Sequence, residues 1–141
     1  MHKKIDPNFN LLCYCKSIYL VFARMNTKVE VVYFPQLKQN VAFVIGKNAK
    51  GNDEAISDAD PEDVWFHLDG HSSCHVIAKM PEDLGRKERG YILRKGAELC
   101  KQNSREKSGK GVEVIYAKIK NITKTDVQGR VMVNESGVIR I

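Results

Sequence analysis

The stretch Asp63–Met80, DVWFHLDGHSSCHVIAKM, contains the only tryptophan of the chain, three of its four histidines and one of its four cysteines. Its first part, VWFHL, has the residue alternation that is typical of a β-strand with two different faces. In a strand this alternation places Val64 and Phe66 on one face of a sheet and Trp65 and His67 on the other. The last part, HVIAKM, predicts a second strand after a turn that contains a glycine.

Upstream of this stretch, two runs rich in β-branched and aromatic residues predict a hairpin. They are Val29–Phe34, VEVVYF, and Val41–Ile45, VAFVI, separated by the turn-like PQLKQN. The segment Gly46–Asp63 is polar and charged, which indicates a surface loop with a helical turn before Pro61.

Downstream, the sequence predicts one long helix from Pro81 to a point near Asn103, with apolar residues at spacings of three and four. Gly96 falls on the apolar side and is expected to permit close contact with the sheet. Three strands follow, and the last two are predicted to form a hairpin. Their ranges are Val112–Ile119, Arg130–Val133 and Val138–Ile141. The fold class expected is α+β, a mainly antiparallel sheet covered by one long helix.

The chain has 141 residues, which favours a single domain. We expect that domain to span residues 25–141, with residues 1–24 as an N-terminal extension of uncertain status. The apolar run Phe9–Ala23 is shorter than the roughly twenty residues that a spanning helix needs, and Asn10 and Lys16 interrupt it. Neither a membrane anchor nor a membrane partner is therefore expected.

The four cysteines contain no C-x-x-C pair. Cys13 and Cys15 lie near the N-terminus, whereas Cys74 and Cys100 fall inside apolar patterns. Buried, reduced thiols are typical of proteins in reducing compartments. The prediction is a cytoplasmic protein, with the nucleus as the alternative location.

The net charge of +6 is concentrated in one part of the chain. The segment from residue 86 to residue 110 has nine basic residues against three acidic ones, a difference of six that equals the net charge of the whole chain. The basic residues are Arg86, Lys87, Arg89, Arg94, Lys95, Lys101, Arg105, Lys107 and Lys110. Such a patch either solvates a helix face or contacts phosphates, and it favours an anionic partner.

The histidines His67, His71 and His75 recur at every fourth residue, but the strand pattern and Gly70 break any helix that would align them. Four readings remain open. They could bind a metal with Cys74 or Asp63, serve a nucleophilic site, lie as satisfied histidines at a sheet edge, or face a nucleic acid beside Trp65. The metal reading corresponds to a metal-dependent hydrolase.

The motif Asp63-Val-Trp-Phe-His67, followed by Ser73-Cys-His75-Val-Ile77, resembles the D-x-W-F/L-H signature of the NFACT-R domain family. The likeness extends in order over about residues 29–141. It includes Val44–Asn48, VIGKN, the residues Gly51–Asp53, and the loop Lys120–Gly129. The chain resembles short eukaryotic proteins built on a lone NFACT-R domain more closely than it resembles the large members of the family. Large members of the family act in ribosome-associated quality control, where they bind the large ribosomal subunit and recruit tRNA.

The resemblance implies RNA-linked binding without catalysis and without a cofactor, with tRNA or ribosomal RNA as the partner. DNA and the ribosome itself are further candidate partners, and the oligomeric state stays open. Asp63 is expected to orient a neighbouring group or to cap the strand. Trp65 would offer a stacking plane on the same exposed side as the basic helix. The residues expected to bind nucleic acid are Trp65, His67, His75, Arg94, Lys95, Lys101, Arg105 and Lys124.

Overall fold

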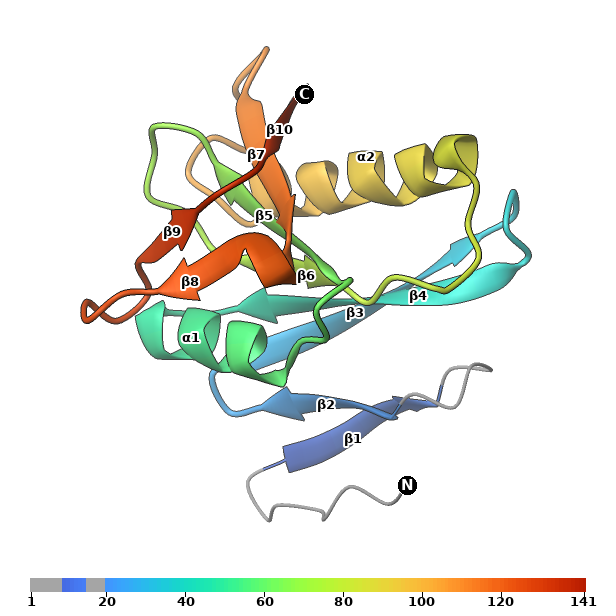
Figure 1. Cartoon of the computed structure of the whole chain (residues 1–141), viewed down its shortest axis with the longest axis horizontal. Coiled ribbons are helices and arrows are strands. Elements are labelled where there is room, and N and C mark those ends of the chain that lie inside the picture. Colours follow the sequence, from blue (N-terminus) through green and yellow to red (C-terminus); the bar gives the residue numbers. More distant parts are fainter. Residues whose placement is uncertain (1–8, 15–19) are drawn as a thin grey trace.

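The computed structural model describes residues 9–14 and 20–141, with side chains described from Arg24 onward. The fold is α+β (Figure 1). The elements are β1 (Phe9–Tyr14), β2 (Leu20–Arg24), β3 (Thr27–Phe34), β4 (Gln39–Gly46), α1 (Ala49–Asp58), β5 (Val64–Leu68), β6 (Val76–Ala78), α2 (Arg86–Gln102), β7 (Glu113–Lys118), the 3-10 helix η1 (Ile119–Asn121), β8 (Ile122–Lys124), β9 (Val131–Val133) and β10 (Gly137–Arg140).

Six strands form the main sheet, in the order β10-β7-β5-β6-β4-β3, and every neighbouring pair is antiparallel. Strand β5 lies inside the sheet, with Trp65 opposite Ile77 of β6 and Ala117 of β7. The predicted hairpin of β3 and β4 is confirmed, and so is the alternation along β5. Val64 and Phe66 pack on one side of the sheet and Trp65 packs on the other.

Each face of the sheet has its own cover. Helix α2 buries Ile92 and Leu99 against Phe66 on one face. On the other face, Ile56 of α1 packs with Trp65, and the hairpin of β8 and β9 packs against the same cluster. Figure 1 shows the two helices on opposite sides of the sheet. The α+β class and the antiparallel sheet are confirmed, but the expected cover of one long helix is incomplete because a second helix and a hairpin cover the other face.

Helix α1 corrects the prediction of a surface loop over residues 46–63. Asn48 caps the helix, since its Oδ1 accepts a hydrogen bond from the backbone N–H of Gly51 at 2.8 Å. Ala55 and Ile56 are buried against the sheet, whereas most other side chains are polar. Two buried apolar side chains in ten residues, one of them only an alanine, give too weak an apolar period to reveal a helix.

Helix α2 begins at Arg86 rather than at Pro81, which corrects its predicted start. Asp83 has a positive φ of 58°, a conformation that a helix cannot contain. The helix starts after Gly85, whose backbone N–H donates to Glu88 Oε2 at 3.2 Å. Its end at Gln102, with Asn103 as the C-cap, agrees with the predicted end.

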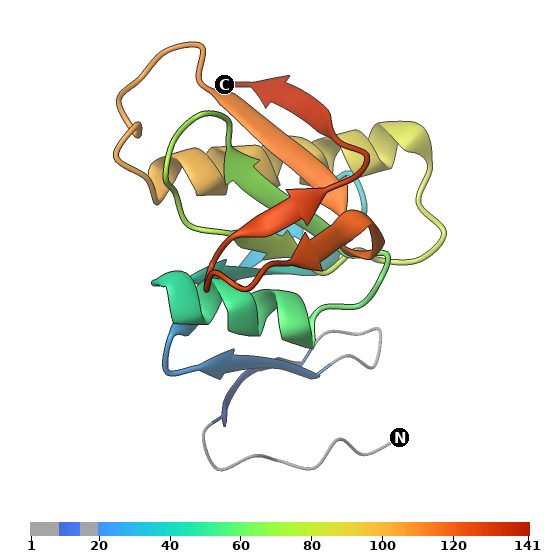
Figure 2. The ribbon, with the colours of Figure 1, turned by 60° about the vertical axis from the view of Figure 1, so that its left-hand side comes forward.

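The last strands pair differently from the prediction. Strand β9 pairs with β8, and β10 adds to the edge of the main sheet beside β7, so β9 and β10 do not form a hairpin with each other. Val131 and Val133 of β9, with Ile122 of β8, pack on the cluster around Trp65. The hairpin of β8 and β9 lies over the sheet next to α1 (Figure 2).

Gly96 confirms the expected close contact between α2 and the sheet. A Cβ atom placed there would lie 2.3 Å from the Phe66 ring. We therefore expect Gly96→Ala to lower the free energy of unfolding by about 1–3 kcal/mol, measured by urea denaturation. Gly90→Ala is the matched control in the same helix, because its Cβ would meet nothing within 4 Å. That variant should gain up to about 1 kcal/mol. Equal effects at both positions would contradict the contact.

Strands β1 and β2 form a separate antiparallel hairpin near the N-terminus. The rest of the predicted extension, residues 1–8 and 15–19, lies outside the described residues, and so does the side chain of Cys13. Among the described residues, no helix combines the length and the apolar character needed to cross a membrane. Cys74 and Cys100 are free thiols, but only Cys100 is buried as predicted, whereas Cys74 is partly exposed.

Candidate nucleic-acid interface

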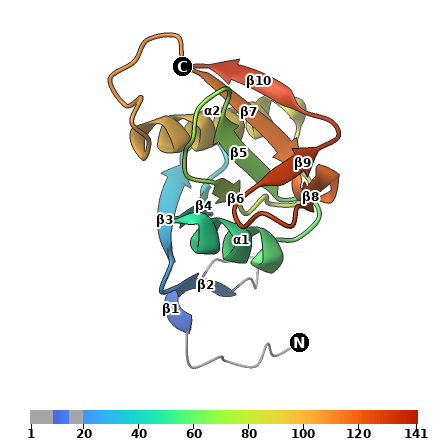
Figure 3. The same ribbon diagram turned by 90° about the vertical axis from the view of Figure 1, so that its left-hand side faces the viewer.

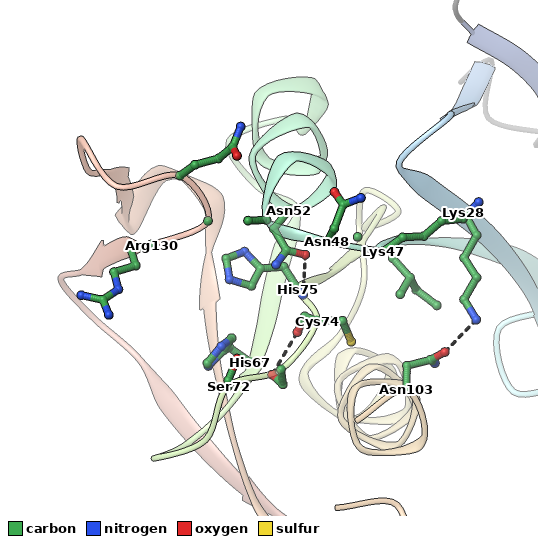
Figure 4. Close-up of a pocket in the computed structure, with 16 residues that line it drawn as sticks. Lys28, Lys47, Asn48, Asn52, His67, Ser72, Cys74, His75, Asn103 and Arg130 are labelled. Atoms are coloured by element: carbon green, nitrogen blue, oxygen red, sulfur yellow. Dashed lines mark hydrogen bonds between the residues drawn. The ribbon is translucent and has the colours of Figure 1, made fainter. Parts of the chain in front are cut away.

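A pocket of ≈ 930 Å³ opens at the end of the sheet where β4 and β5 end and where β3 begins (Figure 4). Three cationic side chains line it, namely Lys28 of β3, Lys47 after β4, and Arg130 before β9. All three are exposed. No Asp or Glu belongs to the lining formed by the described part of the chain. This combination favours an anionic ligand, because the attraction of the cations is not offset by a carboxylate inside the pocket.

The inner wall of the pocket is built from a cluster of three aromatic rings. His67 stacks on Trp65 with ring centroids 5.6 Å apart and an interplanar angle of 3°. His75, which precedes β6, lies edge-on to both, with centroid distances of 5.4 Å to Trp65 and 5.2 Å to His67. His67 and His75 line the pocket, and Trp65 lies behind them.

Trp65 therefore does not offer the exposed stacking plane that the sequence predicted. Its side chain is 3% exposed and packs with Ile77 and Ala117 in the core under α1. The alternation along β5 assigns it to the correct face, but α1 and the hairpin of β8 and β9 cover that face. The role that the structure gives to Trp65 is to support the His67 ring.

Both pocket histidines have lowered pKa values. Burial lowers the pKa of His67, and burial together with the nearby His67 lowers the pKa of His75 to about 3. His75 is therefore neutral at neutral pH. It is 2% exposed, and its Nδ1 has no hydrogen-bond partner among the described residues, nor does Trp65 Nε1. Buried polar atoms normally have partners, so the unpaired Nδ1 beside a pocket is a feature that a ligand or a water could satisfy.

The N-terminus of α1 forms another part of the pocket wall. Lys47, Asn48 and Ala49 line the pocket at the first turn. The cap formed by Asn48 occupies the N–H of Gly51. The backbone N–H groups of Ala49 and Lys50 have no partner within the described residues. Free N–H groups and the positive end of the helix dipole favour an anion at this point.

Two glycines and an asparagine fix this arrangement. The side chain of Asn52 accepts a hydrogen bond from the His75 backbone N–H at 3.0 Å, which ties α1 to the start of β6. A Cβ atom at Gly46 would lie 2.0 Å from Asn52 Oδ1, so only glycine leaves room for this contact. Gly129 has a φ of +82°, and a Cβ there would lie 2.9 Å from Ala49.

The loop between β8 and β9 is held against α1 by a hydrogen bond of 3.0 Å from the Gly129 backbone N–H to Asp53 Oδ1. Figure 3 shows this loop next to the helix. The contact places Arg130 at the pocket, across from Lys47 and Lys28 in Figure 4, with His67 and His75 between them. The same hydrogen bond occupies Oδ1 of Asp53.

Asp63 lies at the opposite end of β5 from His67, away from the pocket. It is 3% exposed and binds the ammonium group of Lys79. It also accepts hydrogen bonds from the backbone N–H groups of Asp60 at 2.9 Å and Met80 at 3.0 Å. Asp63 thus holds a basic group and caps the turn before β5, and it does not orient an imidazole.

The basic helix and the histidines do not share one surface, which corrects the arrangement expected from the sequence. Helix α2 packs on the face of Phe66, whereas Trp65 and His75 belong to the opposite face. Arg94 and Arg105 are exposed, and Lys95 and Lys101 are partly buried. Only the C-terminal end of α2 reaches the pocket, through Asn103, whose Oδ1 accepts from Lys28 Nζ at 2.7 Å.

Lys124, the lysine expected in the later loop, lies in β8. Its ammonium group contacts the Ser57 hydroxyl of α1, and it does not line the pocket. The structure thus brings His67 and His75 together in the pocket but leaves Lys124 outside it.

The metal-site alternative is not supported by the arrangement of its ligands. Within residues 24–141, no group of three His, Cys, Asp or Glu side chains lies close enough to hold a metal ion. His71 is exposed in the turn after β5. Asp63 is four residues from His67 along an extended strand, about 13 Å away. The proposed set of His67, His71, His75 and Asp63 is therefore not assembled.

Several pocket residues were missed by sequence reasoning, namely Lys28, Lys47, Asn48, Asn52 and Arg130. The family resemblance gave one signal for this region, because it includes Val44–Asn48, VIGKN, and the following Gly51–Asp53. That resemblance marked the segment without indicating its role. Lys28 and Arg130 stand in strands or loops with no local feature that distinguishes them from other surface cations.

The comparisons with known proteins agree with this architecture. The sequence is 30% identical over 97 residues to the coiled-coil domain-containing protein 25 homolog of Dictyostelium discoideum, covering 67% of this chain and 47% of that protein. It is 32% identical over 104 residues to coiled-coil domain-containing protein 25 of Mus musculus, covering 67% of this chain and 48% of that one. The chain thus spans about half the length of these relatives.

The fold also resembles a solved structure, the C-terminal part of the fibronectin/fibrinogen-binding protein from Streptococcus suis. The TM-score is 0.63 at 20% identity, over 99% of this chain and 46% of that one. This likeness concerns the fold alone. A family profile described as the NFACT protein RNA binding domain matches residues 30–140, which is most of the chain. The chain therefore belongs to the NFACT RNA-binding domain family, the family that the Asp63–His67 motif resembles.

Proposed function

We infer that this domain binds RNA, and that it does so through the pocket at the end of the sheet. The observation that carries the proposal is the pocket lining, which combines Lys28, Lys47 and Arg130 without a carboxylate among the described residues. The description of the family as an RNA-binding domain supports RNA as the anion.

The surroundings of the pocket suit an RNA strand of several nucleotides. Asn103 at the rim connects the pocket with the C-terminal end of α2. Lys101 lies two residues before Asn103, and Arg105 lies two residues after it. Lys107 and Lys110 continue the exposed basic segment. An RNA strand can therefore run from the loop after α2 into the pocket, with cations along its path.

The domain is proposed to bind without catalysis. In the described part of the chain, neither His67 nor His75 hydrogen-bonds to the side chains of Ser72, Ser73 or Cys74, which also line the pocket. The Ser73 hydroxyl contacts the Cys74 carbonyl at 3.1 Å. A nucleophilic site needs a base within hydrogen-bond reach of the nucleophile, and that pairing is missing here.

We further infer a tRNA or ribosomal RNA partner and a part in translation quality control. This assignment rests on the resemblance to NFACT-R proteins, whose large members work on the large ribosomal subunit. The proposed location is cytoplasmic, with the nucleus as the alternative.

The first test is the salt dependence of binding to a labelled single-stranded RNA, followed by fluorescence anisotropy. If about four phosphates are engaged, the affinity for a single strand should fall roughly fiftyfold between 50 and 200 mM salt, because each contact releases condensed counterions. A single-stranded DNA of the same sequence and a duplex RNA serve as comparisons. An affinity that does not change with salt, or no binding in 50 mM salt, would reject direct RNA binding.

A further inference from the structure

The pocket has features that go beyond a basic surface for a polyanion. Its volume of ≈ 930 Å³ falls within the range of about 300–1,000 Å³ that is usual for small-ligand sites. It is concave, and it is lined by aromatic, amide and cationic groups from separate segments. A flat patch would suffice for phosphate attraction alone, whereas this shape suits one compact unit.

We propose that the pocket holds a single unpaired nucleotide, with its phosphate at the first turn of α1 and its base toward the wall formed by His67 and His75. The proposal rests on the inferred RNA binding and defines which unit of the RNA is held. The phosphate position follows from the free N–H groups of Ala49 and Lys50 and from the adjacent Lys47.

The unpaired His75 Nδ1 is independent support for a ligand at this site. His75 is 2% exposed and lines the pocket, and its Nδ1 has no partner among the described residues. Asn52 holds the His75 backbone, and Trp65 and His67 pack around its ring. The ring therefore carries an unused, buried polar atom next to the pocket.

The base position follows from the aromatic wall. Trp65 stacks on His67 and holds the imidazole in one orientation, while His67 remains partly exposed at the pocket. Histidine rings stack on unpaired bases, and burial lowers the pKa of His67, which disfavours the charged form of the ring. Arg130 and Lys28 lie at the rim of the pocket, where they reach the phosphates of neighbouring nucleotides.

The test uses adenosine monophosphate, inorganic phosphate and adenosine as separate probes of the whole chain, followed by NMR of backbone amides and of histidine imidazole groups. Adenosine monophosphate should shift the amides of Ala49 and Lys50 and the side chains of His67 and His75. Phosphate should shift only the α1 amides, and adenosine should bind more weakly than the monophosphate. If phosphate and adenosine monophosphate caused the same pattern of shifts and bound with the same affinity, the proposed base position would be wrong.

Asn48 offers a matched pair of variants. Aspartate and serine both cap helices about as well as asparagine, and both variants lose the hydrogen bond of 3.1 Å from Asn48 Nδ2 to Asn26 Oδ1, so the two should fold alike. Asn48→Asp introduces a negative charge next to the proposed phosphate position. It should weaken adenosine monophosphate at least tenfold, because like charges about 4 Å apart repel strongly near a protein surface. Asn48→Ser adds no charge, so it should weaken adenosine monophosphate clearly less than Asn48→Asp does.

Equal binding of adenosine monophosphate by Asn48→Asp and the parent would overturn the phosphate position, and no binding at 10 mM ligand would overturn the nucleotide site. If RNA still binds in those cases, the proposed function stands without this site. If adenosine monophosphate binds as expected but RNA does not, the nucleotide site stands and the RNA proposal fails.

Discussion

Replacing Lys28, Lys47 and Arg130 together with glutamate is expected to weaken RNA binding about a hundredfold at about 0.1 M salt. At this salt concentration each phosphate contact with a single strand contributes about fivefold in affinity through counterion release, so the loss of three contacts accounts for the effect. All three side chains are exposed, so the triple variant should retain the fold. Fluorescence anisotropy with a labelled single-stranded RNA gives the affinity, and circular dichroism melting checks the fold.

The matched control reverses three exposed charges on α2, with Arg86, Lys87 and Arg94 replaced by glutamate. Both variants change the net charge by the same amount, but this second set lies in the first half of α2, away from the pocket end of the sheet. The control should lose less than about tenfold, through the general field alone. If the control lost as much as the pocket variant or more, the outer face of α2 would be the RNA surface and the pocket assignment would be wrong.

The sequence predicts the centre of the fold well because its signals there are local. Two segments have the continuous apolar or alternating pattern of strands over several residues, namely Val29–Phe34 and Val41–Ile45. The structure pairs them as β3 and β4. Helix α1 is different, because Ala55 and Ile56 contribute most of its buried apolar surface. The pairing of β10 with β7 is a contact between distant segments, and nothing within Val138–Ile141 distinguishes it from a local hairpin.

The site could be predicted only in part for a related reason. The motif around His67 and His75 is contiguous and unusual, so it could be found, and both residues line the pocket. Lys28 and Arg130 are about a hundred residues apart, and only the fold brings them together. The alternation along β5 shows which residues share a face with Trp65. It cannot show that a helix will cover that face, and the expected exposure of the indole was wrong for that reason.

Asp63→Ala is expected to lower the free energy of unfolding by about 3–4 kcal/mol. The carboxylate is buried, and it accepts hydrogen bonds from the backbone N–H groups of Asp60 and Met80 as well as binding Lys79. Alanine would leave two N–H groups without an acceptor, at about 1–3 kcal/mol each, and would remove one partner of a partly buried ammonium group. The second partner of Lys79, Asp60 at 3.2 Å, remains and limits the loss. Urea denaturation at neutral pH measures the effect.

The adjacent Glu62 provides the control. It pairs with Lys118 at 2.8 Å and Lys120 at 2.9 Å, and these two lysines hold its pKa well below the usual range. It is nevertheless solvent-exposed, so Glu62→Ala should change the stability little. Asp63→Asn keeps an acceptor for one N–H and should fall between the two. Because Asp63 lies away from the pocket, this asparagine variant should bind RNA with the parent's affinity in conditions where it is folded. A tenfold loss of affinity in the folded Asp63→Asn protein would instead assign Asp63 to the binding surface.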